Sequence, residues 1–283
     1  MKAVKRKAAA LTAAVILLIG MVSGCALSSS VFSQKGTALL ILMYHSVLKD
    51  PAKTGMYVIT PSRLEGDMKY LKERGYETVV TEDLIDHVYY GKQLPEKPVI
   101  LTFDDGHYNN LAYALPLLEQ YDMQAVISVV GKYTERYSEN EDKNPAYAYL
   151  SWEDIITLVH SGRVEIQNHS YDMHESSGER RGSKRKQGES AEVYARNFSS
   201  DVSKLQLLLY KKCRVFPTAF TYPFGLIDED SEKVLKQAGF LASYSCTEKI
   251  NRITEDPECL WKLGRYNRDG RLTTEAFFAS IGI

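Results

Sequence analysis

Two aspartates, Asp104 and Asp105, stand side by side where an apolar segment ends. Residues 99–103 form a short apolar run, which is typical of a buried strand, and Gly106 ends it directly after the pair. Adjacent carboxylates at a strand end are costly unless something positive holds one of them. Because successive strand residues point in opposite directions, the two acids can have separate tasks, one binding a metal and the other transferring protons. For this stretch alone, an ordinary acidic turn with Asp-Gly as its signal is the alternative.

Two histidines, His169 and His174, follow a second strand-like segment, residues 164–168. Their spacing of five rotates them off a common helix face, unlike the i,i+4 pair of a zinc protease. We therefore expect them at a strand end and in the loop after it. Two imidazoles and one carboxylate form an open metal site that leaves room for water and substrate. Two histidines alone are more often surface residues, but beside the aspartate pair they favour a metal.

A third apolar segment, residues 39–44, ends in His45. In (β/α) barrels the active site gathers at the carboxyl ends of the strands. Three predicted strands that end in catalytically capable groups therefore favour one shared site, although a buried structural histidine is the alternative for His45. His87, on a predicted helix, and His160, before a helix stop, are expected to be surface residues.

Strands and helices alternate along the rest of the chain, which implies a parallel sheet or barrel. The predicted helices cover residues 61–74, 81–90, 110–121, 152–161, 192–211 and 231–238, and the further strands cover residues 77–80, 125–130, 218–222 and 241–245. Residues 176–190 are polar and basic, and we expect a solvated surface loop there in preference to a loop that contacts an anionic polymer.

The N-terminal segment predicts export. A basic start is followed by an apolar stretch, residues 8–21, that is too short for a comfortable membrane span. Val22-Ser23-Gly24-Cys25 then resembles the lipobox of bacterial lipoproteins, in which the cysteine after the cleavage point is lipidated. We expect a lipoprotein-type signal peptide over residues 1–24, a tether over 25–36 and one catalytic domain over 37–283. Cys25 would anchor the protein to the outer, extracytoplasmic face of a bacterial membrane; a plain signal peptide or an uncleaved anchor is the alternative.

Net charge and cysteine content limit the binding partners and the cross-links that this chain is expected to have. The net charge of −1 gives no field that attracts nucleic acid, and the 44% hydrophobic content of the 283 residues is ample for a folded core. Cys213, Cys246 and Cys259 lack CxxC spacing, so a zinc knuckle is not expected. At most one internal disulfide can form, with Cys246–Cys259 the favoured pair and buried free thiols the alternative.

Three motifs carry a resemblance to the polysaccharide deacetylases, the NodB-homology group also called carbohydrate esterase family 4. They are Thr102-Phe103-Asp104-Asp105-Gly106, His169-Ser170-Tyr171-Asp172-Met173-His174 and Phe220-Thr221-Tyr222-Pro223-Phe224-Gly225. The five-residue histidine step is similar to the branch that acts on poly-β-1,6-N-acetylglucosamine, whereas many peptidoglycan and chitin deacetylases use four. The resemblance covers roughly residues 39–268 and implies an α/β fold, a distorted partial (β/α) barrel in a single domain.

The resemblance also implies roles by position. Asp105, His169 and His174 would bind a divalent metal, often zinc in this family. Asp104 would be the general base, and the backbone N–H of Phe224 would stabilise the oxyanion.

Two positions depart from the family pattern. The family arginine that orients the base is replaced by Thr221, and we assign its task to Arg265. The family's C-terminal Leu-x-x-His general acid is missing before the chain ends, and His45 resembles its permuted replacement in the poly-N-acetylglucosamine branch.

The implied function is metal-dependent removal of N-acetyl groups from N-acetylglucosamine units of an extracellular or cell-wall polysaccharide, either poly-N-acetylglucosamine or peptidoglycan. One rival is a catalytically impaired glycan-binding lipoprotein with the same fold, which the displaced arginine would support. The other is an O-acetyl xylan esterase that uses the same site on an ester. The sequence predicts no protein partner.

Overall fold

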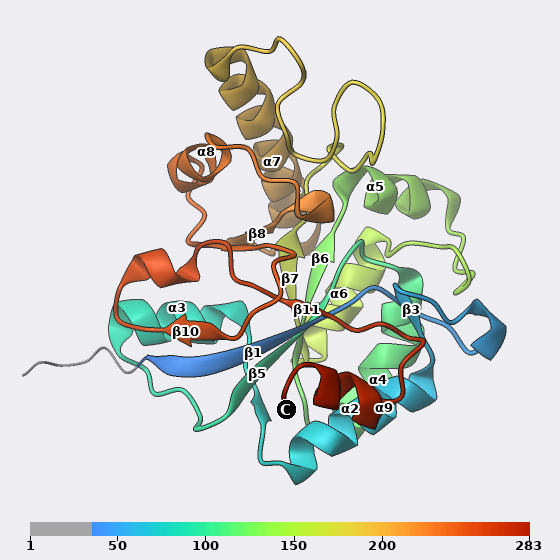
Figure 1. Ribbon diagram of the computed structural model, residues 1–283. Coiled ribbons are helices and arrows are strands. Elements are labelled where there is room, and N and C mark those ends of the chain that lie inside the picture. The colour runs from blue at the N-terminus through green and yellow to red at the C-terminus, as the bar shows by residue number, and fades with distance from the viewer. Residues whose placement is uncertain (1–35) are drawn as a thin grey trace, which may run out of the picture. The chain divides into compact units, whose positions relative to one another are not determined.

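A largely parallel β-sheet forms the centre of the structure (Figure 1). The computed structural model describes residues 36–283, so the predicted signal peptide, Cys25 and nearly all of the tether lie outside the described residues. The main path of the sheet is β10 (Asn251–Ile253), β1 (Thr37–Tyr44), β5 (Pro98–Phe103), β6 (Ala125–Val129), β7 (Val164–Asn168), β8 (Ala219–Thr221) and β9 (Ala242–Tyr244). All pairs from β1 to β9 are parallel, and β10 is antiparallel to β1.

Shorter strands complete the sheet and a small extension. β4 (Glu77–Thr78) pairs with β5, and β11 (Tyr266–Asn267) pairs with β1. β2 (Ser46–Val47) and β3 (Val58–Ile59) form a separate parallel pair directly after β1.

Helices follow most of the strands. They are α2 (Pro61–Glu73), α3 (Thr81–Tyr90), α4 (Leu115–Tyr121) with a π-helical start η2 (Asn110–Ala114), α5 (Gly131–Asn140), α6 (Trp152–His160), α7 (Ala191–Cys213), α8 (Ser231–Gln237) and α9 (Thr274–Ser280). Three short 3₁₀ turns are η1 (Pro51–Lys53), η3 (Pro223–Gly225) and η4 (Pro257–Leu260). Thr60 caps α2 by accepting a hydrogen bond from the N–H of Arg63, and Ser151 caps α6 in the same way through Asp154.

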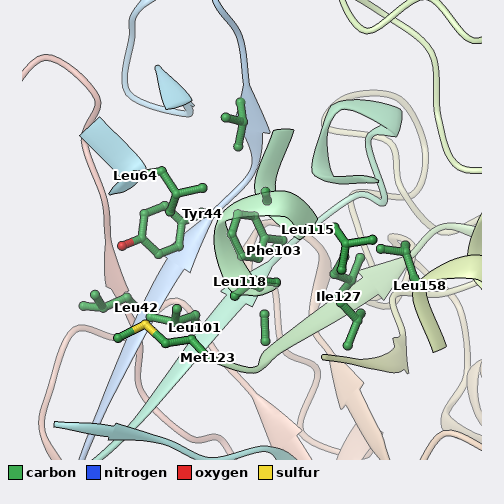
Figure 2. Packing of buried hydrophobic residues seen from close by; sticks show 14 of the residues in the cluster. Leu42, Tyr44, Leu64, Leu101, Phe103, Leu115, Leu118, Met123, Ile127 and Leu158 are labelled. Carbon is green, nitrogen blue, oxygen red and sulfur yellow. The ribbon is translucent and has the colours of Figure 1, made fainter. Parts of the chain in front are cut away.

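The central strands β1 and β5 are buried on both faces over most of their length, which explains their nearly continuous apolar sequences. Alternate residues of β1 point to opposite sides: Leu40 and Leu42 join a cluster with helices α2, α4, α6 and α9, whereas Leu39 and Ile41 join a second cluster that includes α3. Figure 2 shows the first cluster, in which Tyr44 stacks on Phe103 at the ends of β1 and β5, with ring centroids 5.1 Å apart. The two hydrophobic clusters, one on each face of the sheet, fix the positions of the strand ends that carry the candidate site.

The α/β class and the partial (β/α) barrel predicted from the sequence are confirmed by this topology. The sequence did not predict α5, α9 or the antiparallel β10. The buried residues of α5 are only Gly131 and Thr134, and its inner face otherwise carries two tyrosines, Tyr133 and Tyr137, that pack on Tyr149. No aliphatic stripe therefore signalled the helix.

The predicted Cys246–Cys259 disulfide is wrong, because the three cysteines of the described part are free thiols. The Cys246 sulfur lies 3.9 Å from Nη2 of Arg265, whereas the Cys259 sulfur accepts a hydrogen bond from the backbone of Thr254. The two thiols therefore have different surroundings.

The basic segment 176–190 is mostly exposed, but it is attached to the domain. Arg185 pairs with Asp228, Arg180 pairs with Glu189, and Ser183 is buried. These internal ion pairs neutralise the positive charges of Arg180 and Arg185, which an anionic polymer would otherwise bind. Among residues 36–283, no helix is long and apolar enough to cross a membrane.

Candidate active site

The candidate residues converge at the carboxyl ends of neighbouring strands. His45 follows β1, the two aspartates follow β5, and His169 follows β7. The backbone is unusual at two of these ends, since Asp105 has a φ of 71° and Ser170 a φ of 73°. Residues other than glycine rarely adopt this left-handed conformation, and such positions concentrate at functional sites.

Asp105, His169 and His174 form a cluster whose donor atoms all lie within 4.8 Å of one another. Nε2 of His174 lies 3.0 Å from Oδ1 of Asp105, and Nε2 of His169 lies 3.5 Å from the same oxygen. Nδ1 of His169 donates to the carbonyl of Thr221 at 2.8 Å, which leaves the Nε2 lone pair facing the cluster. The donor set therefore fits a divalent metal such as zinc.

The electrostatics of this cluster favour an ionised carboxylate. Burial raises the pKa of Asp105, but the imidazoles of His107, His169 and His174 around the carboxylate outweigh burial and hold the pKa well below its usual value. Burial lowers the pKa of His169, yet the neighbouring carboxylates raise it above the ordinary histidine value. The Asp105 carboxylate and the His169 ring thus attract each other, and a cation bound at Nε2 would require the neutral form of the ring.

Asp104 is held by Arg265 on the other side of the strand end. Nη1 of Arg265 lies 2.7 Å from Oδ1 of Asp104, Nη2 lies 2.8 Å from Oδ2, and both side chains are buried. Burial raises the pKa of Asp104, but the guanidinium more than offsets this and the pKa is lowered. Thr221, at the position of the family arginine, instead shares a hydrogen bond with Ser128.

Arg265 is itself fixed by the backbone and by β5. Its Nε donates to the carbonyl of Ser245 at 3.0 Å, and Nη1 also donates to Oγ1 of Thr102 at 3.1 Å. The guanidinium therefore has little freedom to leave Asp104, and the carboxylate is presented in one orientation.

His45 lies beside this pair, with its ring centroid 4.7 Å from that of Tyr57. Its Nδ1 is buried and has no hydrogen-bond partner among the described residues. Burial lowers the pKa of His45, although Asp104 and Asp105 act in the opposite direction.

Phe224 occupies the η3 turn, with a φ of 58°. Its ring is 45% exposed and packs 4.6 Å from the ring of His174. The turn thus brings the backbone of the third motif to the edge of the histidine cluster.

A cavity of about 960 Å³ joins these groups. Its lining includes every site residue predicted from the sequence except Arg265, which lies behind Asp104, and Cys25, which is outside the described residues. The volume is typical of a ligand site. His160 is exposed on α6, and His87 contacts the carbonyl of Lys92, so neither takes part in the cavity.

The sequence analysis did not single out His107, a cavity residue that lies beside Asp105. Its Nε2 lies 3.5 Å from Oδ2 of Asp105, and its ring stacks on Tyr149 with centroids 4.8 Å apart. Its position two residues after Asp105 was the available signal.

The profile of the polysaccharide deacetylase family matches residues 91–243, and the chain belongs to this family. A poly-beta-1,6-N-acetyl-D-glucosamine N-deacetylase of Escherichia coli K12 is 25% identical over 240 residues, which cover 75% of this chain and 36% of the relative. The enzyme of the same name from Staphylococcus aureus MRSA252 is 25% identical over 194 residues, which cover 68% of this chain and 62% of the relative. The chain thus spans about a third and three fifths of the lengths of these relatives.

Solved structures show the same fold. A de-N-acetylase from Aggregatibacter actinomycetemcomitans superposes with a TM-score of 0.70 at 24% identity, over 86% of this chain and 98% of that one. IcaB from Ammonifex degensii gives a TM-score of 0.69 at 23% identity, over 87% and 97%.

Proposed function

We propose that this protein is a metal-dependent polysaccharide N-deacetylase that hydrolyses N-acetyl groups of poly-β-1,6-N-acetylglucosamine. One observation carries the proposal: an Asp-His-His cluster and an arginine-held second aspartate line the same cavity. The activity for which the relatives are named suggests the substrate, and peptidoglycan is the second polymer to test.

Asp105, His169 and His174 would hold the metal, for which we propose zinc. When bound there, a divalent cation polarises an amide carbonyl and makes water more acidic. Asp105 stays ionised among the imidazoles, so the chain already presents the anionic ligand that the cation requires.

Asp104 is the proposed general base. Arg265 keeps its carboxylate ionised and oriented, and the carboxylate faces the cavity in which water and substrate would meet. It accepts a proton from the attacking water as the carbonyl carbon becomes tetrahedral.

The remaining steps fall to Phe224 and His45. A backbone N–H at Phe224 stabilises the developing oxyanion, which is worth about 3–4 kcal/mol for a well-placed donor. His45 gives a proton to the departing sugar amine as the C–N bond breaks. The products are acetate and a glucosamine unit, so a neutral glycan gains positive charge.

The deciding experiment is acetate release from poly-N-acetylglucosamine, peptidoglycan and acetylxylan, measured side by side with and without chelator. The proposal requires chelator-sensitive release from poly-N-acetylglucosamine. Release from acetylxylan alone would identify an esterase, and tight glycan binding without release would identify a binding protein.

We also propose that Cys25 is lipidated and holds the enzyme on the outer face of a bacterial membrane. The order of basic residues, apolar residues and cysteine supports this. Metabolic labelling with an alkyne fatty acid should mark the wild-type protein and leave Cys25→Ser unlabelled. Equal labelling of both would refute the anchor.

A further inference from the structure

His107 approaches the metal-ligand candidate Asp105 from the side that the other histidines leave open. The two histidines of the second motif face Oδ1 of Asp105, whereas Nε2 of His107 lies 3.5 Å from Oδ2. The two oxygens of one carboxylate therefore have different neighbours.

The same geometry places His107 outside the metal cluster. The donor atoms that lie within 4.8 Å of one another come from Asp105, His169 and His174, and His107 does not belong to this group. Ligands of one zinc ion lie about 2.0–2.2 Å from it and hence close to one another. His107 is thus near the carboxylate without being near the position that the ion would take.

The ring of His107 is held by an aromatic stack on Tyr149, which is not a member of the cluster. It stacks on Tyr149 at an interplanar angle of 25°, and Tyr149 in turn packs on Tyr133 with centroids 4.5 Å apart. An antiparallel bridge joins the backbones of His107 and Tyr149. Two hydrogen bonds flank the bridge, from Tyr108 N to Ala148 O at 2.9 Å and from Leu150 N to Gly106 O at 2.8 Å.

We propose that His107 is a positioning residue that donates a hydrogen bond from Nε2 to Oδ2 of Asp105 and so directs Oδ1 to the metal. The present separation of 3.5 Å is longer than a formed hydrogen bond, and a small rotation of the carboxylate closes it. With Oδ2 occupied, Asp105 binds through one oxygen and the position beside it stays open for water or substrate. This inference rests on the proposed metal site.

The test is zinc affinity, measured on apo protein by competition with a chromophoric chelator, with no substrate present. Loss of an outer hydrogen bond to a ligand lowers metal affinity by about 10- to 100-fold, so we expect His107→Ala to bind zinc that much more weakly at an unchanged stoichiometry. His107→Gln, whose amide N–H can reach the same oxygen, should recover most of the affinity. His160→Ala, on the exposed end of α6, is the matched control and should bind like the wild type.

Three results would overturn the proposal. Wild-type affinity in His107→Ala would show that the contact has no effect, and equal weakness of His107→Gln would show that only the packing of the ring matters. A loss of stoichiometric binding, as expected for Asp105→Asn, would make His107 a ligand. If His107→Ala fails to fold, two other variants replace it in the test. Near-normal zinc affinity in His107→Gln together with weakened zinc affinity in Tyr149→Ala would support the positioning role. A wild-type chain that binds zinc but releases no acetate would reject the proposed function and leave this test intact.

Discussion

Arg265 donates hydrogen bonds to both carboxylate oxygens of Asp104, although the two residues are 161 positions apart in the chain. The segment after β9 therefore brings a buried cation to the end of β5. In the third motif, at the end of β8, Thr221 stands in place of the family arginine. Thr221 hydrogen-bonds to Ser128 and its carbonyl accepts from His169, so it supports the histidine cluster. The charge that orients Asp104 and the contacts that orient the proposed metal ligands come from separate segments of the chain.

Replacing Arg265 should shift the pH dependence of catalysis. Arg265 is the main group that lowers the pKa of Asp104 against the effect of burial, so this pKa should rise in Arg265→Gln. The ionised base then forms only at higher pH, and the acid limb of the profile of kcat/KM should move upward. Arg265→Lys keeps the positive charge but cannot donate to both carboxylate oxygens in the same geometry. The acid limb of its kcat/KM profile should therefore lie between those of the wild type and Arg265→Gln.

A second buried pair provides the control for this experiment. Arg268 donates to both oxygens of Asp67, both side chains are buried, and neither residue lines the cavity. Arg268→Gln and Arg265→Gln should each cost about 3–5 kcal/mol of unfolding free energy, because each leaves a buried carboxylate unpaired. An equal shift of the acid limb in both variants would mean that stability, and not the pKa of Asp104, sets the profile.

The Asp104–Arg265 ion pair should also affect how the free energy of unfolding changes at acidic pH. Its folded pKa is lowered, so its contribution to stability is complete above the unfolded value and is lost as the pH falls through the folded pKa. In Arg265→Gln the folded pKa lies closer to or above the unfolded value, so this variant should lose less stability than the wild type as the pH falls through this range. Urea unfolding between neutral and acidic pH measures both slopes, and parallel slopes would contradict the assignment.

Substitutions of the two adjacent aspartates should differ in their effect on metal binding. Asp104→Asn should lower turnover by about 10²–10⁴-fold, the usual share of a general base, while the metal stays bound. Asp105→Asn, His169→Ala and His174→Ala should lose the metal. Elemental analysis of dialysed protein gives the stoichiometry, and unfolding free energies identify any general loss of structure. Near-wild-type turnover by Asp104→Asn would rule out the base.

Metal removal should lower the stability of the wild type. A ligand that binds only the folded state at 100 times its Kd adds about 2.7 kcal/mol, so chelation should reduce the free energy of unfolding by an amount of this order. Asp104→Asn should show the same chelator effect, and His174→Ala should show none. If chelator leaves the wild-type melting temperature unchanged, the Asp-His-His cluster is not a metal site.

The sequence predicts the strands better than it predicts the contacts. β1 and β5 are nearly continuous apolar runs because both faces of the sheet are covered there, and β7 alternates apolar and polar residues. The ends of these three segments locate His45, Asp104 and His169. His107 escaped notice because the partner that fixes its ring, Tyr149, comes from a loop without periodicity. Helix α5 escaped because it has no aliphatic stripe, and the orientation of Arg265 depends on a turn that no local pattern specifies. Local patterns reveal strand ends, whereas the pairing across them is a property of the folded chain.

The role of His45 can be tested through the leaving group. An N-acetyl amide expels an amine that must gain a proton, whereas an aryl acetate such as 4-nitrophenyl acetate expels a group that needs none. If His45 is the general acid, His45→Gln should slow amide hydrolysis by about 10²–10⁴-fold and change aryl ester hydrolysis far less. Tyr57→Phe keeps the ring that packs on His45 and serves as the matched control, with both rates expected to stay close to those of the wild type. Equal losses on both substrates would place His45 in substrate binding or water attack, because a proton donor to the leaving group cannot affect a reaction that requires no such proton.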